Sequence, residues 1–394
     1  MIPATPYWLQ NRQRIGPELE QNITCDVVVV GGGITGLAVC RGLLKEGIDT
    51  VLVEGREIAM SATGRNAGFI LQGTAERYNR AIEVYGREKA RQIHQYTIDN
   101  HKRIQSCIEE EELDCEYRKS GSLQLAGSAQ EEEELRESQK LLCEDGFVAE
   151  LLEDLPLHYK EANFELGVLL PEDGEIQPAQ YVRQSAQRFQ QRGLRIFEES
   201  PVLKIHDSAD SVLCECPKGT ISAQMVIVCT NAQIATLCPL LKNKVDPVRG
   251  QMLSTSPAPK IFERPIYADH GYDYWRQCPD GRIVLGGWRN LDPETETGCE
   301  EVLHADIQRN MEDFLRRFRA LQNITIENRW SGIMGFSFDG LPLMGALPGY
   351  SSTLIAAGFT GHGFGFAQLV GEEVAQLVIE GHSELTKFMG CHRI

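Results

Sequence analysis

The sequence predicts an α/β fold, α+β overall, in which a discontinuous Rossmann-type domain carries an inserted domain of mixed sheet. Two observations lead to this prediction. A strand, a glycine turn, a helix and a second strand follow one another in residues 25–54, and similar buried strands return much later, at 224–229 and 352–357. The chain also has 394 residues, a length typical of two domains rather than one small core.

The first predicted unit is a strand, a helix and a second strand. Residues 25–30 read CDVVVV, a continuously apolar run typical of a strand buried on both faces. Residues 34–47 carry leucines at helical spacing and close on a glycine, which predicts a helix with a C-terminal stop. Residues 49–54, DTVLVE, form the next strand. The unit is therefore a βαβ motif with parallel strands and a right-handed crossover.

The middle of the chain predicts long helices first and strands later. Residues 83–113 and 130–145 are charge-rich with apolar residues at helical spacing, and their glutamate runs are interpreted as solvated helix faces. Further along we expect a helix at 178–193, short strands at 194–206, and strand-rich structure at 247–330 with a helix near 302–318. These elements divide the chain into a nucleotide-binding domain (1–80, 165–245 and 331–394) and an inserted substrate domain (81–164 and 246–330).

Composition excludes several classes of partner. The formal net charge of −17 argues against nucleic acid and anionic membrane surfaces, because both would be repelled. No run approaches the roughly 20 apolar residues of a membrane span, and the N-terminus lacks the apolar core of an export signal, so we expect a cytoplasmic protein. The 12 cysteines are scattered without four-ligand spacing, so no metal site is predicted.

The turn after the first strand carries the spacing Gly31-x-Gly33-x-x-Gly36. Gly31 permits the tight turn, Gly33 lets a pyrophosphate approach the backbone, and Gly36 lets helix and strand pack closely. The helix that follows presents free N–H groups and the positive end of its dipole. Glu54 ends the second strand, where it can accept hydrogen bonds from ribose hydroxyls. Together these features predict a dinucleotide site.

A second glycine-rich helix start lies near the end of the chain, in AGFTGHGFGFAQLVG at 357–371. Two such starts in one chain suggest that two anionic parts of one ligand are bound. The loop GREIAMSATGRNAGF at 55–69 adds small residues and the donors Arg65 and Asn66. The glycine motif alone does not distinguish FAD from NAD.

The wider sequence resembles a known family. GGGITGLAVCRGLLKEGIDTVLVEGR followed by SATGRNAGF resembles the D-amino-acid-oxidase-like flavoproteins, a family that includes glycine oxidase, monomeric sarcosine oxidase and γ-glutamylputrescine oxidase. The resemblance continues through DPVRGQM, YWRQCPDGRIVLGGW, WSGIMGFSFDGLPLMG and GFTGHGFGFA, in family order over nearly the whole chain. SATGRN, WSGIMG and GFTGHG look most similar to the γ-glutamylputrescine oxidase branch.

The resemblance implies FAD as the cofactor. Noncovalent binding is expected because the matched flavin motifs contain no cysteine, although His362 keeps a histidine link open. The C-terminal glycine loop would lie against the pyrimidine end of the flavin, where a helix N-terminus stabilises developing negative charge. The implied cofactor-binding residues are Gly31, Gly33, Ile34, Thr35, Gly36, Glu54, Gly55, Arg56, Ala62, Thr63, Gly64, Arg65, Asn66, Val202, Thr230, Asn231, Gly358, Thr360, Gly361, His362 and Gly363.

Four residues are candidates for the catalytic site. Strand alternation places Tyr274 and Arg276 on one face, together with Tyr272, and the resemblance places this strand beside the substrate. Arg276 would then bind a substrate carboxylate bidentately, or instead pair with one of the chain's acids. Trp330 would wall the pocket or pack in the core. His362 would donate to the flavin or simply pack in the bend.

The resemblance implies an FAD-dependent amine or amino-acid oxidoreductase. Such an enzyme oxidises the carbon–nitrogen bond of a small-molecule amine or amino acid to an imine by hydride transfer to flavin N5, and oxygen reoxidises the flavin. The alternatives are a dehydrogenase that passes electrons to a quinone or other carrier, oxidation of a 2-hydroxy acid, and a flavin module without catalysis. The substrate and the oligomeric state stay open.

Overall fold

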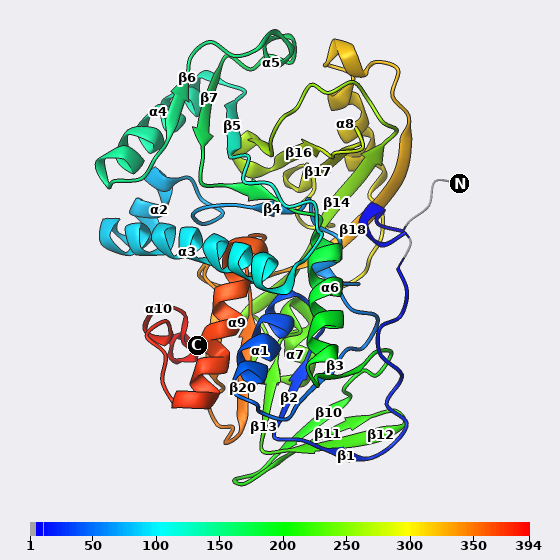
Figure 1. Ribbon diagram of the computed structural model, residues 1–394. Coiled ribbons are helices and arrows are strands. Elements are labelled where there is room, and N and C mark those ends of the chain that lie inside the picture. Colours follow the sequence, from blue (N-terminus) through cyan, green and yellow to red (C-terminus); the bar gives the residue numbers. More distant parts are fainter. Residues whose placement is uncertain (1–4, 11) are drawn as a thin grey trace.

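The computed structural model describes residues 5–10 and 12–394, and most of their strands belong to two principal sheets (Figure 1). The first sheet has six strands in the order β19-β20-β13-β2-β3-β9. All neighbours are parallel except β19, which runs antiparallel to β20. The predicted parallel core is confirmed. Its strands are β2 (Val27–Val30), β3 (Thr50–Val53), β9 (Arg195–Phe197), β13 (Met225–Val228), β19 (Leu343–Ala346) and β20 (Thr353–Ala357).

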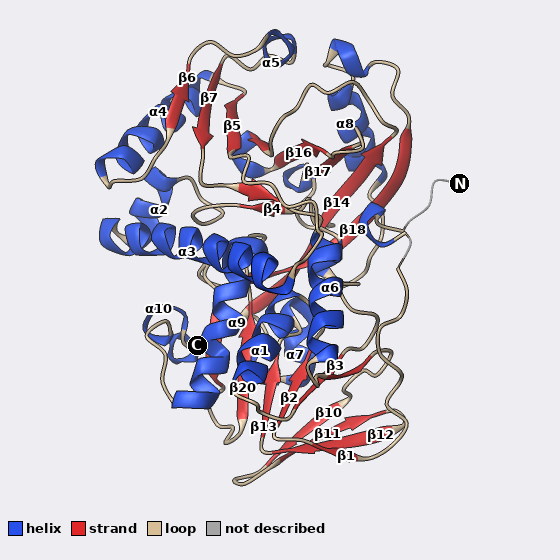
Figure 2. Cartoon of the chain, in the orientation of Figure 1, coloured by secondary structure: helices blue, strands red, loops and turns tan. Residues whose placement is uncertain are grey.

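The six-stranded sheet is buried on both faces, which explains its continuously apolar strands. Val27 and Val29 face a core shared with three helices, whereas Val28 and Val30 face a core shared with a small four-stranded sheet. Figure 2 shows the small sheet below the first one and the helices packed beside it. The helices are α1 (Ile34–Lys45), α6 (Pro178–Gln191) and α9 (Gly363–Glu380), and the strands are β1 (Ile23–Thr24), β10 (Lys204–Asp207), β11 (Val212–Cys216) and β12 (Gly219–Ala223).

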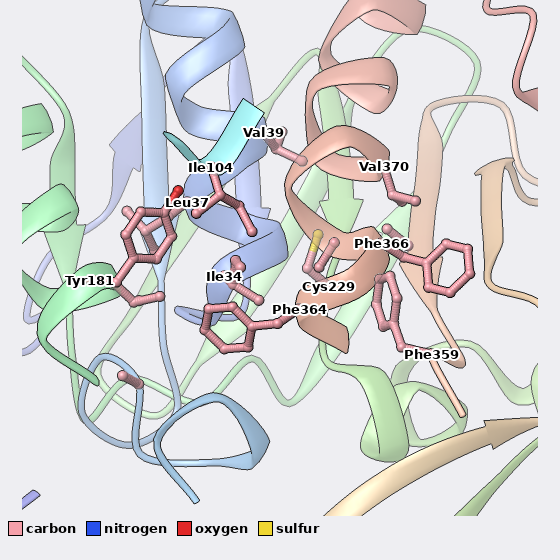
Figure 3. Packing of buried hydrophobic residues seen from close by; sticks show 14 of the residues in the cluster. Ile34, Leu37, Val39, Ile104, Tyr181, Cys229, Phe359, Phe364, Phe366 and Val370 are labelled. Atoms are coloured by element: carbon pink, nitrogen blue, oxygen red, sulfur yellow. The ribbon is translucent and has the colours of Figure 1, made fainter. Parts of the chain in front are cut away.

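Helices α1 and α9 pack against each other at glycines. A Cβ atom added at Gly42 of α1 would lie 2.5 Å from the Cβ of Ala375, and one added at Gly371 of α9 would lie 2.6 Å from the Cβ of Ala38. Figure 3 shows side chains of both helices in one apolar cluster. The glycines let the two backbones approach closely, and this packing fixes both helix N-termini relative to each other.

The second sheet has eight strands and is mixed, as predicted. Its order is β18-β14-β17-β16-β15-β5-β7-β6, with β15 and β5 parallel and the other neighbours antiparallel. It lies above the first sheet in Figure 1. The strands are β5 (Ser122–Ala126), β6 (Glu150–Leu152), β7 (Leu166–Leu170), β14 (Val245–Thr255), β15 (Ile266–Ala268), β16 (Asp273–Gln277), β17 (Ile283–Gly287) and β18 (Ile326–Ser337).

Helices accompany the second sheet, and a two-stranded ribbon lies near it. The helix predicted at 83–113 is broken, because Gly86 takes a φ of +82° between α2 and α3. The helices are α2 (Tyr78–Tyr85), α3 (Arg87–Glu111), α4 (Ala129–Glu144), α5 (Leu157–Glu161) and α8 (Ala305–Leu315), and the ribbon is β4 (Phe69–Ile70) with β8 (Gly174–Glu175).

The sheets divide the sequence slightly differently from the predicted segments. Strand β7 pairs with β5 and β6 in the eight-stranded sheet, although residues 165–245 were assigned to the nucleotide domain. Strand β18 runs straight through the predicted boundary between 330 and 331. Apolar strands of the two sheets look alike in sequence, so only their pairing reveals which sheet they join.

The glutamate runs are not uniformly solvated, contrary to the prediction. Glu111 is 3% exposed and pairs with Arg192 at 2.8 Å. Glu131 is 5% exposed, accepts a hydrogen bond from Gly127 N at 2.9 Å and pairs with Arg77. Each buried carboxylate has a cationic partner, which offsets the cost of removing it from water.

Short elements complete the fold. No helix in the described part of the chain is long and apolar enough to cross a membrane. The short helices are α7 (Ile234–Leu237) and α10 (Thr386–Met389), with 3-10 turns at Tyr7–Leu9, Ala62–Gly64, Asn231–Gln233, Pro239–Leu241, Asp269–Gly271, Arg289–Leu291, Arg319–Leu321 and Cys391–Arg393.

Candidate active site

A cavity of about 570 Å³ is walled by both principal sheets and by the starts of α1 and α9. This volume is typical of a cofactor or ligand site. All the cofactor residues predicted from the sequence line it except Gly36, Gly64 and Gly358. A Cβ atom at Gly36 would lie 2.0 Å from the Gly31 carbonyl oxygen, and one at Gly64 would lie 2.1 Å from the Ala59 carbonyl oxygen. These two glycines therefore permit close packing of the loops that form the wall.

The glycine turn after β2 forms one end of the cavity. Gly31 has a φ of +114°, a conformation that other residues rarely adopt, and its Cβ position lies 2.8 Å from the Cys229 carbonyl oxygen. Gly33 is the N-cap residue of α1 and has no side chain. A Cβ atom added there would contact only the hydroxyl of Thr63, at 3.0 Å. The N-terminus of α1 is therefore open to the cavity, where its dipole favours an anion.

Glu54 stands beside this turn. One carboxylate oxygen accepts a hydrogen bond from Gly32 N at 2.6 Å, and the other accepts one from Arg56 N at 2.8 Å. Burial raises the pKa of the Glu54 carboxyl, and the two backbone donors oppose that rise. Each oxygen keeps acceptor capacity for a further donor such as a sugar hydroxyl.

The loop after β3 is held in shape mainly by its own side chains. Asn66 Nδ2 donates to the carbonyl oxygens of Ala62 and Thr63, and its Oδ1 accepts from Gly68 N at 2.7 Å. The Thr63 hydroxyl accepts from Ile34 N at 3.2 Å, which ties the loop to the start of α1. The predicted donor Asn66 is thus engaged within the loop, and the loop's backbone lines the cavity.

Arg65 connects the same loop to neighbouring segments of the fold. Its guanidinium donates to the carbonyl oxygens of Met60 and Ser331, both at 2.8 Å, and pairs with Glu301 at 2.8 Å. Glu301 also pairs with Arg56 at 2.6 Å. Glu301 therefore connects a segment of the inserted region to two arginines of the loop that follows β3.

The C-terminal glycine loop closes the opposite end. Gly358, Thr360 and Gly361 all have φ between +47° and +79°, so the chain makes a left-handed bend before α9 begins. Asn231 Oδ1 accepts from Gly358 N at 2.9 Å and fastens this loop to the end of β13. His362 caps α9 without a side-chain bond to it. Burial lowers the pKa of His362 to about 4, so its ring is neutral.

Aromatic side chains surround the part of the cavity next to this loop. The rings of Tyr267 and Tyr274 stack with centres 5.7 Å apart, and Phe69 meets both edge-on at 5.6 and 6.2 Å. The Tyr267 ring lies 6.4 Å from that of His362. Burial raises the pKa of Tyr274 to about 12. The aromatic rings give this part of the cavity, here called the aromatic chamber, an apolar lining, which disfavours charge on a bound amine.

Arg289 is the cation of the aromatic chamber. Its guanidinium carbon lies 4.6 Å from the ring centre of Tyr272 and 5.0 Å from that of Phe336. Burial raises the pKa values of Tyr267 and Tyr274, and the positive charge of Arg289 opposes that rise. Burial lowers the pKa of His362, and the charge of Arg289 adds to this lowering. Aromatic contacts hold the guanidinium, and its N–H groups remain available to donate to an anion.

Two predicted catalytic residues lie outside the cavity. Arg276 is 1% exposed, its Nη1 lies 3.3 Å from a Glu175 oxygen, and its guanidinium is 4.9 Å from the Trp8 ring centre. Tyr274 and Arg276 share a strand face, but two residues of strand separate them by roughly 7 Å. Tyr274 therefore lines the cavity and Arg276 does not; the geometry favours the alternative that Arg276 pairs with an acid.

Trp330 is the second predicted catalytic residue that lies outside the cavity. It is 1% exposed, packs in the core, and donates from Nε1 to the Arg65 carbonyl oxygen at 2.9 Å. Trp330 therefore supports the loop that follows β3 through this hydrogen bond. Of the expected catalytic set, Tyr274 and His362 line the cavity.

The sequence reasoning missed Tyr267 and Arg289. Tyr267 belongs to β15, a strand too short to show alternation. Arg289 follows the pair Gly286-Gly287, and a Cβ at Gly287 would lie 1.8 Å from the Tyr272 carbonyl oxygen. A pair of glycines within a strand indicates a close approach of two backbones. This pair is the feature of the sequence that could have predicted the contact between Arg289 and Tyr272.

The cavity fits an FAD group. Its two helix N-termini and glycine loops suit the anionic parts of such a molecule, and Glu54 suits a ribose. The hydroxyl of Thr230 is buried against the cavity and has no hydrogen-bond partner within the protein. A polar ligand is the natural partner for such a group.

Comparisons with known proteins agree with this geometry. The model of the family described as DAO, FAD dependent oxidoreductase, matches residues 26–377. The γ-glutamylputrescine oxidoreductase of Escherichia coli K12 is 28% identical over 95% of this chain and 89% of its own length. The glycine oxidase of Bacillus licheniformis is 27% identical over 90% of this chain and 93% of its own.

Solved structures share the fold. The glycine oxidase of Geobacillus kaustophilus has a TM-score of 0.78 at 20% identity, covering 93% of this chain and 98% of its own. The L-proline dehydrogenase of P. horikoshii has a TM-score of 0.76 at 21% identity, covering 94% of this chain and 96% of its own. At these identities the likeness concerns the fold alone.

Proposed function

This chain belongs to the DAO family of FAD-dependent oxidoreductases, and on that premise we propose that it oxidises the carbon–nitrogen bond of an amine or amino acid to an imine. The observation that carries the proposal is the continuity of one cavity from the glycine turn at α1 to the aromatic chamber at α9. A nucleotide cofactor and a small substrate would share this cavity. The imine product hydrolyses in water.

The residues that would hold FAD are those of the two glycine loops, with Glu54 and Thr230. When bound, FAD would supply the acceptor for the hydride, at N5, and oxygen would reoxidise it. The protein contributes position and charge. The α9 N-terminus provides partial positive charge at its end of the cavity, and the neutral His362 beside it adds a polar group without a second full charge.

The aromatic chamber acts on the substrate amine. An ammonium has no lone pair on nitrogen to support loss of hydride from the neighbouring carbon, so the amine must first be neutral. Tyr267, Tyr274 and Phe69 exclude water from this part of the cavity, and a low-dielectric surrounding disfavours the ammonium form. The chamber thus favours the reactive form and restricts its orientation.

Arg289 supports a substrate that carries an acidic group in addition to its amine. Its N–H groups suit a carboxylate, and its contacts with Tyr272 and Phe336 fix its position. By their names, the relatives above act on γ-glutamylputrescine and on glycine, and both of these compounds carry an amine and a carboxylate. We propose this class of substrate here.

The test is an anaerobic screen. Purified protein containing FAD is mixed with monoamines, amino acids, γ-glutamyl amines and 2-hydroxy acids, and bleaching of the flavin absorbance is followed. We expect bleaching by an amine that carries a carboxylate. Bleaching by hydroxy acids alone, or by no compound of any class, would contradict the proposal. Readmitting oxygen or adding a quinone to the bleached protein then identifies the electron acceptor.

A further inference from the structure

A second cavity, here called the side pocket, adjoins the aromatic chamber. It has a volume of about 60 Å³ and is walled by α2, α3, α4 and the sheet strands β5 and β15. Tyr267, His270 and His362 belong to the walls of both cavities. Since one water needs roughly 10–15 Å³ of such space, the side pocket has room for a short chain of waters.

Asp173 is the buried acid of the side pocket. It is 1% exposed; one carboxyl oxygen accepts from Gln72 N at 2.8 Å and the other from the Ser122 hydroxyl at 2.5 Å. Both donors are neutral, and no ion pair joins Asp173 to a cation in the described part of the chain. Burial raises the pKa of Asp173 to about 7, although these hydrogen bonds oppose the rise.

The wall also contains an unmatched donor. Gln72 is 8% exposed and its Oε1 lies 2.9 Å from His94 Nε2. Its Nε2 makes no hydrogen bond of ordinary geometry within the protein, although the Gln72 side chain is close enough to Asp173 to lower the pKa of that carboxyl. A buried donor of this kind calls for a partner in the adjoining space. The side pocket is therefore a polar site with unused hydrogen-bonding capacity rather than a packing gap.

The other titratable groups around Asp173 are neutral, already paired or, like Glu76 in the wall, exposed to solvent. On α3, burial lowers the pKa of His94 to about 3 and that of His101 to about 4. Glu172, the next residue, pairs with Lys119 at 2.6 Å. Elsewhere in the wall, Arg77 pairs with Glu131 and Glu134 of α4, and His270 lies 3.3 Å from Glu134. None of these groups neutralises Asp173.

The main cavity offers few groups that can accept a proton from an amine. Arg56, Arg65 and Arg289 are cations, and Glu54 lies at the nucleotide end with its oxygens bonded to Gly32 and Arg56. Burial raises the pKa values of the tyrosines Tyr267 and Tyr274 and lowers the pKa of His362. His270 lines both cavities but lies beside Glu134, at 3.3 Å. A buried carboxyl just beyond Tyr267 and His362 meets the need better, because no ion pair engages it in the described part of the chain.

We propose that Asp173 accepts, through the side pocket, the proton that the substrate ammonium loses before its carbon–nitrogen bond is oxidised. The inference rests on the proposed function, because it requires an amine substrate. An N–H bond of the ammonium breaks, its electron pair stays on nitrogen, and an O–H bond forms on Asp173. The Tyr267 hydroxyl, the His362 ring and waters of the side pocket can relay the proton. Asp173 later releases it to solvent, and no oxidant is involved in this step.

The kinetic test compares Asp173→Asn with the wild-type protein. The rate of anaerobic flavin reduction at saturating amine is measured by stopped flow from pH 6 to pH 10. At pH 7 we expect roughly a hundredfold slower reduction, the size of a typical general-base effect. The deficit should close as the pH approaches about 10, where an ordinary amine is increasingly neutral in solution. Glu172→Gln removes the neighbouring carboxylate and should behave as wild type.

Three kinetic outcomes would overturn the inference. An equal deficit at every pH would mean that Asp173 has only a structural role. A raised KM with an unchanged limiting rate would make the side pocket a binding site for part of the substrate. An unchanged pH profile would leave His270 as the acceptor to examine. Flavin content and thermal stability of both variants exclude simple misfolding.

A second measurement needs no substrate. Burial also raises the pKa of Asp273, to about 8, so the Asp173 band is identified as the protonated-carboxyl band that Asp173→Asn removes. In infrared difference spectra of the FAD-bound protein, this band should disappear as pH rises through about 7. Absence of the band in the wild type would overturn the inference even if amines bleach the flavin. A titrating band in a protein that no amine bleaches would place the failure in the proposed function instead.

Discussion

Individual residues give the two ends of the cavity different chemistry. At the α1 end, Gly31 and Gly33 keep side chains away from the helix N-terminus, so the backbone itself faces the ligand. At the α9 end, Arg289 is held by aromatic contacts, and its charge acts on the tyrosines and on His362. A single substitution at the α9 end should therefore affect the use of substrate and leave FAD binding measurable.

Replacing Gly33 with valine should abolish FAD binding. The added Cβ would meet the Thr63 hydroxyl at 3.0 Å, and the branched methyl groups would project into the path of a pyrophosphate. The measurement is the ratio of flavin to protein absorbance after purification. Gly33→Ala is the matched control and should lose less flavin. Full flavin content in a folded Gly33→Val protein would mean that the phosphates bind elsewhere.

Replacing Arg289 with alanine should impair the use of substrates that carry a carboxylate. A hydrogen bond to a charged group contributes about 1.5–3 kcal/mol, so kcat/KM should fall roughly ten- to a hundredfold. A monoamine without a carboxylate should be affected much less, and Arg289→Lys should retain part of the activity. Equal losses on both kinds of substrate would assign Arg289 to folding or to the cofactor.

Arg276→Ala provides the contrasting variant. Arg276 is buried against Glu175 and Trp8 rather than in the cavity. Its removal should lower the free energy of unfolding by about 1–3 kcal/mol without changing the preference among substrates. A shift in that preference would return Arg276 to the substrate site.

At the scale of secondary-structure elements, the helices α1 and α9 form the two ends of the site. Both begin at the cavity, and both lack a side-chain cap at their first turn. Ile34 N donates to the Thr63 hydroxyl and Gly365 N to the His362 carbonyl oxygen, and the other N–H groups of these turns are available to a ligand. The two helices cross at Gly42 and Gly371, where no side chain separates them. The spacing between their N-termini thus depends on the packing at these two glycines.

Replacing Gly371 with valine should weaken both stability and FAD binding. The new Cβ would lie 2.6 Å from the Cβ of Ala38 and 2.7 Å from the Thr35 carbonyl oxygen, so α9 must move away from α1. Overpacking of this kind costs about 1–3 kcal/mol. Thermal unfolding and FAD titration measure the two effects, with Ile379→Ala at an exposed position of α9 as the control. Lower stability with unchanged FAD affinity would show that the two N-termini tolerate the shift.

At the scale of the whole molecule, the cavity joins the two principal sheets. Residues at the carboxyl ends of β2 and β13 line it from one side, and residues of β14 to β18 line it from the other. Glu301 adds a link outside the cavity by pairing with Arg56 and Arg65. A ligand bound there would contact both halves of the fold.

Removing FAD should therefore destabilise the whole protein rather than one loop. A ligand at a hundred times its Kd stabilises the folded state by about 2.7 kcal/mol, which corresponds to a rise of several degrees in Tm. Calorimetry of the apoprotein with increasing FAD measures this rise, and Gly33→Val should not respond. An unchanged Tm in the presence of bound FAD would mean that the ligand is not part of the cooperative unit.

The sequence by itself determined the βαβ unit and most of the residues that line the α1 end of the cavity. Strand, glycine turn and helix are adjacent in the chain, so their spacing fixes their geometry, and the positions from Gly31 to Asn66 could be named in advance. The C-terminal loop was found in the same way, because its glycines serve its own backbone bend at Gly358 and Gly361. Apolar periodicity also located most of the long helices and buried strands.

Only the tertiary structure decided which side chains form the aromatic chamber and the side pocket. Tyr267, Arg289 and Asp173 come from separate strands and turns, and strand pairing rather than sequence distance brings them together. Alternation along β16 placed Arg276 on the same face as Tyr274, but it does not encode where the cavity ends along the strand. Likewise, the sequence around Glu131 predicted a solvated carboxylate, whereas the fold buries it against Arg77, the N-cap residue of α2. Local spacing specifies local geometry, whereas long-range pairing specifies which groups meet.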